Sequence, residues 1–82
     1  MSSLATKMRR AHTALNQHIE EQVYERLQKN SYLALRYLKC TCEDGVVTIQ
    51  GRVPSYYLKQ LAQTVVGQVE GVEKVVNQVE VA

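Results

Sequence analysis

The chain has 82 residues, of which 45% are hydrophobic, and a formal net charge of +2. This length suits one small domain, and the composition excludes global disorder. The charge is too small to indicate nucleic-acid binding, and no apolar run reaches the roughly 20 residues of a membrane span. Because no basic segment followed by an apolar stretch opens the chain, no signal peptide is visible. We therefore expect a cytoplasmic or membrane-peripheral chain, or a periplasmic one if it is a piece of a larger protein.

The N-terminal segment allows two interpretations. It contains three bases, and the first acidic residue of the chain is Glu20. Its apolar residues recur at helical spacing. Either one long helix begins near Ser3, or a tail leads into a helix that Asn16 caps. Since an isolated helix of this length is marginal in water, we favour the tail: residues 1–16 form a mobile basic extension, and residues 17–82 form the domain. The bases are Lys7, Arg9 and Arg10, and the apolar residues are Leu4, Met8, Ala11 and Leu15.

The next two elements are predicted to be a helix over residues 17–28 and a strand over residues 32–42. The helix has an apolar stripe through Ile19, Val23 and Leu27. Asn30 and Ser31 separate it from the strand. One face of that strand holds Ala34, Leu38, Cys40 and Cys42, and the other face holds Leu33, Leu35 and Tyr37. With neither Phe nor Trp in the chain, the core must be aliphatic.

Cys40 and Cys42 are interpreted as small buried hydrophobic residues. Extended backbone directs two side chains at i and i+2 side by side, which makes a disulfide between them awkward. A structural zinc site needs about four ligands, and His12 and His18 lie in another part of the chain. We expect no metal and no cofactor.

The stretch from Asp44 to Val53 predicts a β-hairpin turn followed by a strand. Gly45 supplies the positive φ that a tight hairpin turn requires. Apolar and polar residues alternate along the strand, and Gly51 stands where that alternation calls for an apolar side chain. A glycine there indicates close approach of another segment.

A second helix and a last strand complete the chain. Ser55 is a natural N-cap, and the helix that it begins contains Gly67 and ends near Gly71 as its C′ residue. The strand runs over residues 73–81, and Asn77 stands in its apolar row, which indicates a hydrogen bond to nearby backbone. The order is helix, strand, strand, helix, strand. A right-handed crossover then gives an α+β fold: a three-stranded mixed sheet with both helices on one face.

These residues resemble the BON domain, a small bacterial module. The similarity covers residues 17–82. It lies in Asp44 to Val53, in Ser55 and Ala62, and in the ending Val69, Gly71, Val72, Val75, Asn77, Val79 and Val81. The resemblance implies an αββαβ fold, a structural role for Gly45, Gly51, Gly71 and Asn77, no enzymatic activity, and association with phospholipid membranes.

The topology itself separates the charges into an acidic and a basic end. The hairpin turn and the start of the last strand carry acids, whereas bases and tyrosines gather at the opposite end, a combination that suits phosphate headgroups. The candidate headgroup site there is Arg26, Lys29, Arg52, Ser55, Tyr56, Tyr57 and Lys59.

The alternative to a membrane site is a protein-interaction or self-association module, acting through a sheet edge or through the N-terminal stretch. The predicted partner is thus an anionic phospholipid surface or another protein domain, and not nucleic acid. We expect a monomer or a weak dimer. No nucleophile–base pair, phosphate loop or metal-ligand spacing is present, so we expect no catalysis.

Overall fold

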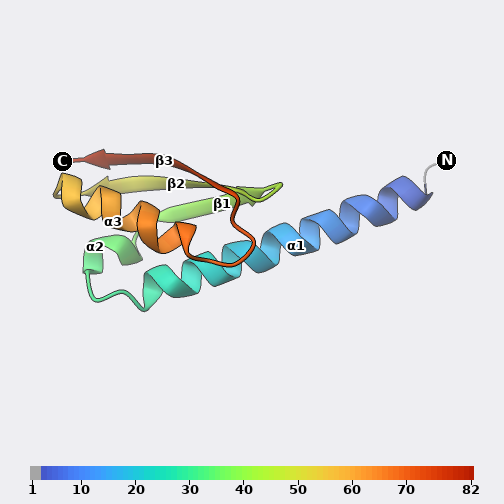
Figure 1. Cartoon of the computed structure of the whole chain (residues 1–82), viewed down its shortest axis with the longest axis horizontal. Coiled ribbons are helices and arrows are strands. Elements are labelled where there is room, and N and C mark those ends of the chain that lie inside the picture. Colours follow the sequence, from blue (N-terminus) through green and yellow to red (C-terminus); the bar gives the residue numbers. More distant parts are fainter. Residues whose placement is uncertain (1–2) are drawn as a thin grey trace.

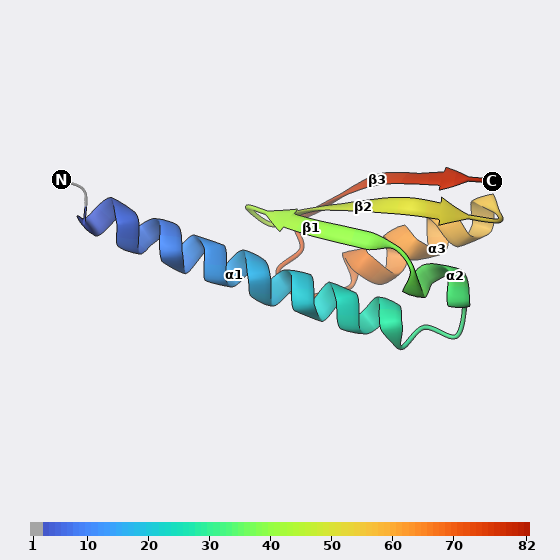
Figure 2. The same ribbon diagram turned by 180° about the vertical axis from the view of Figure 1, so that it is seen from behind.

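The computed structural model describes residues 3–82, with side chains from residue 14 onward. Its elements are α1 (Ser3–Gln28), α2 (Leu33–Arg36), β1 (Lys39–Glu43), β2 (Val46–Val53), α3 (Tyr56–Gly67) and β3 (Lys74–Val81). The molecule is elongated, with extents of 50 × 20 × 18 Å. The start of α1 and the end of β3 lie at opposite ends of the long axis (Figures 1 and 2).

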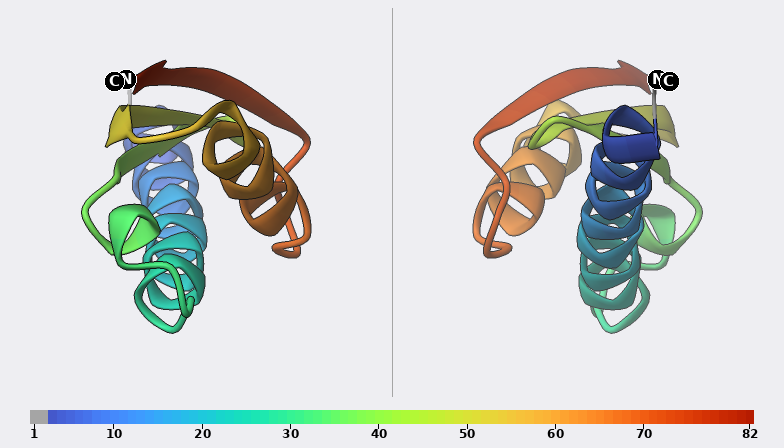
Figure 3. Two further views of the ribbon diagram at one scale, coloured as in Figure 1. Left: turned by 90° about the vertical axis from the view of Figure 1, so that its left-hand side faces the viewer. Right: turned by 90° about the vertical axis from the view of Figure 1, so that its right-hand side faces the viewer.

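The three strands form one mixed sheet in the order β1-β2-β3. β2 runs antiparallel to β1 and parallel to β3. All three helices lie on one face of this sheet, and the other face is bare (Figure 3). The predicted α+β fold with a three-stranded mixed sheet is therefore confirmed. The short helix α2 is an addition that the sequence analysis did not foresee.

The core lies between the sheet and the helices and is aliphatic, as the absence of Phe and Trp predicted. Val47, Ile49 and Val53 of β2 are buried, in the phase that the alternation required, and they meet the apolar stripes of α1 and α3. The buried side chains of these three elements are Ile19, Val23, Leu27, Val47, Ile49, Val53, Leu58, Ala62 and Val66.

The β1–β2 hairpin forms as predicted, with the turn at Asp44-Gly45. Both turn residues have positive φ, +54° and +80°, as a two-residue turn that follows the twist of the strands requires. The register pairs Cys42 with Val47, which sends both side chains toward the core. At Gly51, φ is +145°, and an added Cβ would lie 2.6 Å from the Leu38 side chain. The predicted close approach is thus made by the segment before β1.

The predicted start of the first helix is wrong. One continuous helix, α1, begins at Ser3 and passes through Asn16 without a break. Instead of capping a helix, the Asn16 side chain accepts a hydrogen bond from the Asp44 N–H, at 3.1 Å, and so links α1 to the hairpin turn. Residues 1 and 2 of the predicted extension lie outside the described chain, and so do the side chains of residues 3–13.

The predicted strand over residues 32–42 is wrong in its first half, where the chain forms α2. Leu35 and Leu38 are both buried, at 0% and 4% exposure. A strand would send residues three apart to opposite faces, whereas a helical turn brings them together. The turn begins where Asn30 Oδ1 accepts the Tyr32 N–H at 2.9 Å. Only the second half of the predicted strand forms a strand, β1, which pairs with β2.

The start of α3 was predicted correctly, but its end was not. At its start, Ser55 Oγ accepts the Leu58 N–H at 3.3 Å, which confirms the N-cap. At its end, α3 stops at Gly67, with Gln68 as the C-cap, four residues before the predicted C′ residue Gly71. Gly71 instead lies in the turn toward β3, against the Ile19 side chain of α1.

Candidate functional site

At one end of the sheet lies a cluster that we call the hairpin pole, which consists of Asn16, Asp44, Gly45, Gly71 and Glu73. These residues line one hollow of about 430 Å³ together with Leu15 and Ile19. The Gly45 carbonyl accepts the Glu73 N–H at 2.8 Å, which holds the start of β3 against the hairpin turn. Glu43 and Glu70 flank this pole in the sequence. Two of the acids that the topology predicted at this end, Asp44 and Glu73, thus line the same hollow.

The opposite end, which we call the α2 pole, presents large apolar and aromatic side chains to solvent. Figure 1 shows α2, the start of α3 and the end of β3 together at this end. Leu33 is 61% exposed and Tyr37 is 80% exposed. The rings of Tyr32 and Tyr57 meet edge to face with centroids 6.2 Å apart. The exposed side chains that define the α2 pole are Tyr32, Leu33, Tyr37, Tyr56 and Tyr57.

Two of the predicted bases lie at the same end of the sheet as these aromatic side chains. Arg52 is exposed near the end of β2, on the bare face of the sheet, and its partner in the strand register is Glu80 of β3. Lys59 is half-buried in the first turn of α3. Ser55 is also here, but its hydroxyl oxygen already accepts the N–H of Leu58, so Ser55 orders the helix start.

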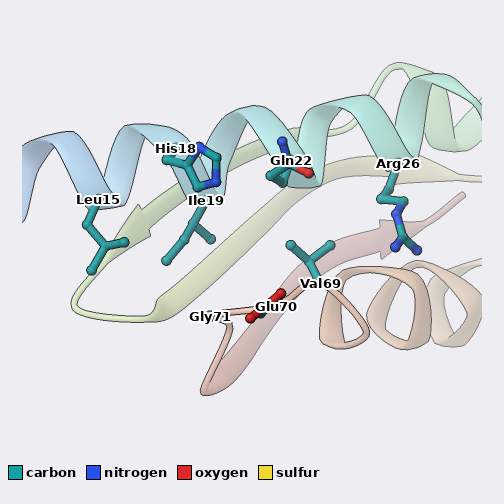
Figure 4. A pocket seen from close by; sticks show the side chains of 8 residues that line it. All are labelled: Leu15, His18, Ile19, Gln22, Arg26, Val69, Glu70 and Gly71. Atoms are coloured by element: carbon teal, nitrogen blue, oxygen red, sulfur yellow. The ribbon is translucent and has the colours of Figure 1, made fainter.

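The other two predicted bases do not face the α2 pole. Lys29 donates to Glu25 at 2.7 Å, in an exposed pair one helical turn apart, which lowers the pKa of that carboxyl. Arg26 lines a hollow between α1 and the loop that follows α3, near Val69 and Glu70 (Figure 4). Arg52 and Lys59 thus lie at the same end of the sheet as the tyrosines, whereas Arg26 lines a separate hollow.

Leu33 and Tyr37 were missed as members of the α2 pole because their segment was predicted to be a strand. Arg36 Nε donates to the Asn30 carbonyl at 2.8 Å, and the Arg36 carbonyl accepts Gln28 Nε2. These two bonds fold the segment back on the end of α1. The signal that could have found it is the spacing of three between Leu35 and Leu38, directly after a break at Asn30.

The family model of the BON domain matches residues 16–82. The chain belongs to the BON domain family. Membership indicates a small non-catalytic binding module. Among curated proteins, none matches the sequence. None of the helices within residues 3–82 of this BON domain combines the length and hydrophobicity that a membrane span requires.

The outer edge of β3 in this BON domain is partly capped by the Asn77 side chain. The N–H groups of Lys74 and Ala82 donate to the β2 side, at Gly45 and Val53. Because backbone groups alternate in direction along a strand, the Val79 N–H points to the open edge. Asn77 Oδ1 accepts it at 3.1 Å, while Asn77 Nδ2 donates to the Lys59 carbonyl of α3 at 3.0 Å. The predicted backbone hydrogen bond of Asn77 is thus confirmed, and it removes one donor that an added strand would need.

The edge of β1 is short and lies beside α1. β1 has five residues, and an apolar hollow between it and α1 is lined by Tyr24, Leu38 and Cys40. The Cys40 thiol lies 3.9 Å from the Glu20 carbonyl of α1, so the helix closes on this edge. Together with the capped β3 edge, this makes strand addition a poor use of the BON sheet.

The two cysteines of the BON domain are free and belong to the core, as predicted. Cys42 is buried, and its thiol lies 3.7 Å from Asn16 Oδ1. Burial raises the pKa of both thiols, so at neutral pH they are protonated and weakly nucleophilic. Over the part of the chain with described side chains, no group of His, Cys, Asp and Glu is placed to hold a metal ion.

Proposed function

We propose that this BON domain is a peripheral membrane module whose α2 pole rests on an anionic phospholipid surface. The observation that supports this most is the set of five exposed side chains, four tyrosines and one leucine, at one end of the molecule. Tyrosine has an apolar ring and a polar hydroxyl, which suits the boundary between acyl chains and headgroups. Leu33, at 61% exposure, adds an apolar group that water does not favour.

The charges favour the same orientation. Arg52 and Lys59 lie at the α2 pole, and the N-terminus of α3 adds its partial positive charge there. Asp44 and Glu73 lie at the other end of the sheet, where an anionic surface would not repel them strongly. Each base near an anionic surface contributes about 1 kcal/mol, so the aromatic contacts and the bases are both needed for stable binding.

The test is co-sedimentation of the full chain with phosphatidylglycerol vesicles and with phosphatidylcholine vesicles. We expect binding to the anionic vesicles that falls as salt rises. The double variant Arg52→Ala with Lys59→Ala should lower the partition coefficient by roughly 30-fold, since two bases are lost. Its matched control is Lys74→Ala with Arg26→Ala, which removes the same charge away from the α2 pole and should bind almost as the wild type does.

A second pair of variants tests the aromatic part. Tyr56→Ala with Tyr57→Ala should weaken binding to anionic vesicles, whereas Tyr24→Ala, an exposed tyrosine on α1, should not. Equal binding to the two kinds of vesicle, or equal losses in the α2-pole variants and their controls, would refute the proposed site. In that case the second class of partner, another protein domain, would take its place.

A further inference from the structure

The short helix α2 carries one base, Arg36, which lies between two members of the α2 pole in the sequence. Leu33 stands three residues before Arg36, and Tyr37 follows it. Residues three and four apart share one face of a helical turn, so Arg36 and Tyr37 lie on the side of α2 that Leu33 occupies. The buried residues Leu35 and Leu38 lie on the other side. Arg36 therefore belongs to the outward face of α2.

One nitrogen of the Arg36 guanidinium is held by the protein itself. Its Nε donates to the Asn30 carbonyl at 2.8 Å, which restricts the direction of the side chain. The backbone of Arg36 is held as well, because its carbonyl accepts Gln28 Nε2 at 2.6 Å. Within the turn, the Leu35 N–H donates to the Tyr32 carbonyl at 3.1 Å. The guanidinium is thus ordered before any ligand arrives, which lowers the entropy cost of binding one.

The two terminal nitrogens of Arg36, Nη1 and Nη2, have no partner among the described residues. Neither makes a hydrogen bond there, and none of the described carboxylates pairs with this side chain. Every buried nitrogen and oxygen of the described side chains does have a hydrogen-bond partner. Because Nη1 and Nη2 lack one, both must reach the solvent.

A pair of N–H groups in one plane suits a ligand that has two oxygens on the same atom. Arginine binds phosphate with such a pair, whereas lysine acts as a point charge. On the membrane surface proposed above, Leu33 and Tyr37 would lie at the boundary between acyl chains and headgroups. The guanidinium on the same face of α2 can then extend to the level of the headgroup phosphates.

We propose that Arg36 binds the phosphate group of a phospholipid headgroup through Nη1 and Nη2, while its Nε stays on the Asn30 carbonyl. This inference rests on the membrane contact proposed for the α2 pole, and it adds the ligand group and the residue that holds it. Arg52 and Lys59 attract the anionic surface by their charge. Arg36 makes a directed contact, because its guanidinium is already oriented.

The test is the charge-preserving variant Arg36→Lys in the full chain, with binding to phosphatidylglycerol vesicles as the readout. Lysine keeps the positive charge but cannot offer two parallel N–H groups. The partition coefficient should fall by about 10-fold, since one charge-assisted hydrogen bond is lost. The matched control is Arg26→Lys, the same substitution in the hollow between α1 and the loop after α3. It should change the partition coefficient by less than about 2-fold, since the charge is kept.

A second control separates the phosphate contact from the order of α2. Gln28→Ala removes the bond to the Arg36 carbonyl but leaves the guanidinium unchanged. Its partition coefficient should fall by less than about 2-fold, because the phosphate contact is kept. Amide hydrogen exchange at Leu35 checks in each variant that the α2 turn is formed. If Gln28→Ala loses as much binding as Arg36→Lys, the bonds around Arg36 only shape the α2 pole, and the proposal is overturned.

The NMR signal of the Arg36 Nε–H group gives a direct readout and distinguishes a lipid headgroup from free phosphate. It should shift when dihexanoyl-phosphatidylglycerol micelles are added. Inorganic phosphate at about 1 mM should leave it unchanged, because free phosphate gains nothing from the apolar and aromatic side chains of the α2 pole. An equal shift with inorganic phosphate would assign the site to free phosphate and overturn the headgroup contact.

The vesicle measurements also separate this proposal from the membrane contact itself. Equal binding of the wild type to phosphatidylglycerol and phosphatidylcholine vesicles refutes the membrane contact, and the headgroup contact of Arg36 falls with it. A wild type that prefers the anionic vesicles, together with an Arg36→Lys variant that binds them equally well, refutes the role of Arg36 alone.

Discussion

The Asn77 side chain links β3 to α3 by hydrogen bonds, and the variant Asn77→Ala measures how much these bonds contribute to the free energy of unfolding. The variant loses the hydrogen bonds to the Lys59 carbonyl, at 3.0 Å, and from the Val79 N–H, at 3.1 Å. A third contact, to Gln63, is exposed and counts for little. At about 1 kcal/mol for each of the two partly buried bonds, Asn77→Ala should lower the free energy of unfolding by about 2 kcal/mol. In a domain of this size, such a loss lowers Tm by roughly 10 °C.

Urea unfolding followed by far-UV circular dichroism tests this value. The matched control is Gln78→Ala, the next residue along β3, whose hydrogen bond with Gln50 is exposed; it should change the free energy of unfolding by less than about 0.5 kcal/mol. Amide hydrogen exchange gives a second readout, since the Val79 N–H should exchange faster in Asn77→Ala. If the two variants unfold at the same urea concentration, the Asn77 bonds add no net stability and the reasoning fails.

Two further predictions concern the core beside the hairpin. Gly51→Ala should destabilise the domain by about 2–5 kcal/mol, because a Cβ there meets Leu38 and φ is +145°. In a Leu38→Ala background part of this loss of stability should disappear. If urea unfolding shows that the effects of the two substitutions simply add, the contact between residues 51 and 38 is not the cause. Burial raises the pKa of the Cys40 and Cys42 thiols in the folded state. Their contribution to the free energy of unfolding is therefore fully present below the pKa of the unfolded thiols, and it is lost as pH rises through the pKa of the folded thiols. Iodoacetamide should therefore alkylate the native protein more slowly than the urea-unfolded protein at pH 8, and equal rates would contradict the burial.

The elements that could be predicted from the sequence have their signals within a few residues. Asp44-Gly45 specified the hairpin, the alternation of β2 specified its buried face, and Ser55 specified the start of α3. The segment from Leu33 to Tyr37 could not be predicted in this way, because its residues alternate as a strand does. A helical turn forms there instead of a strand, because contacts with distant parts of the chain bury both Leu35 and Leu38.

The candidate site shows the same division. Arg52, Tyr56, Tyr57 and Lys59 lie at one end of the sheet because they follow one another around the junction between β2 and α3. Arg26 lies instead in the hollow between α1 and the loop after α3, since the direction of a side chain on a long helix depends on what packs against each face. Asn16 is a similar case. Its side chain suits a helix N-cap, but it accepts a hydrogen bond from the backbone N–H of Asp44, 28 residues away in the sequence.

The position of the two chain ends has a consequence for how the domain would act on membranes. The α2 pole and the start of α1 lie at opposite ends of a molecule 50 Å long (Figure 1). A fluorophore attached at the start of α1 would therefore stand far from a membrane on which the α2 pole rests. Energy transfer from it to an acceptor on the lipid headgroups should be weak, whereas transfer from a fluorophore at the α2 pole should be strong. The comparison of the two positions thus reports the orientation of the bound domain.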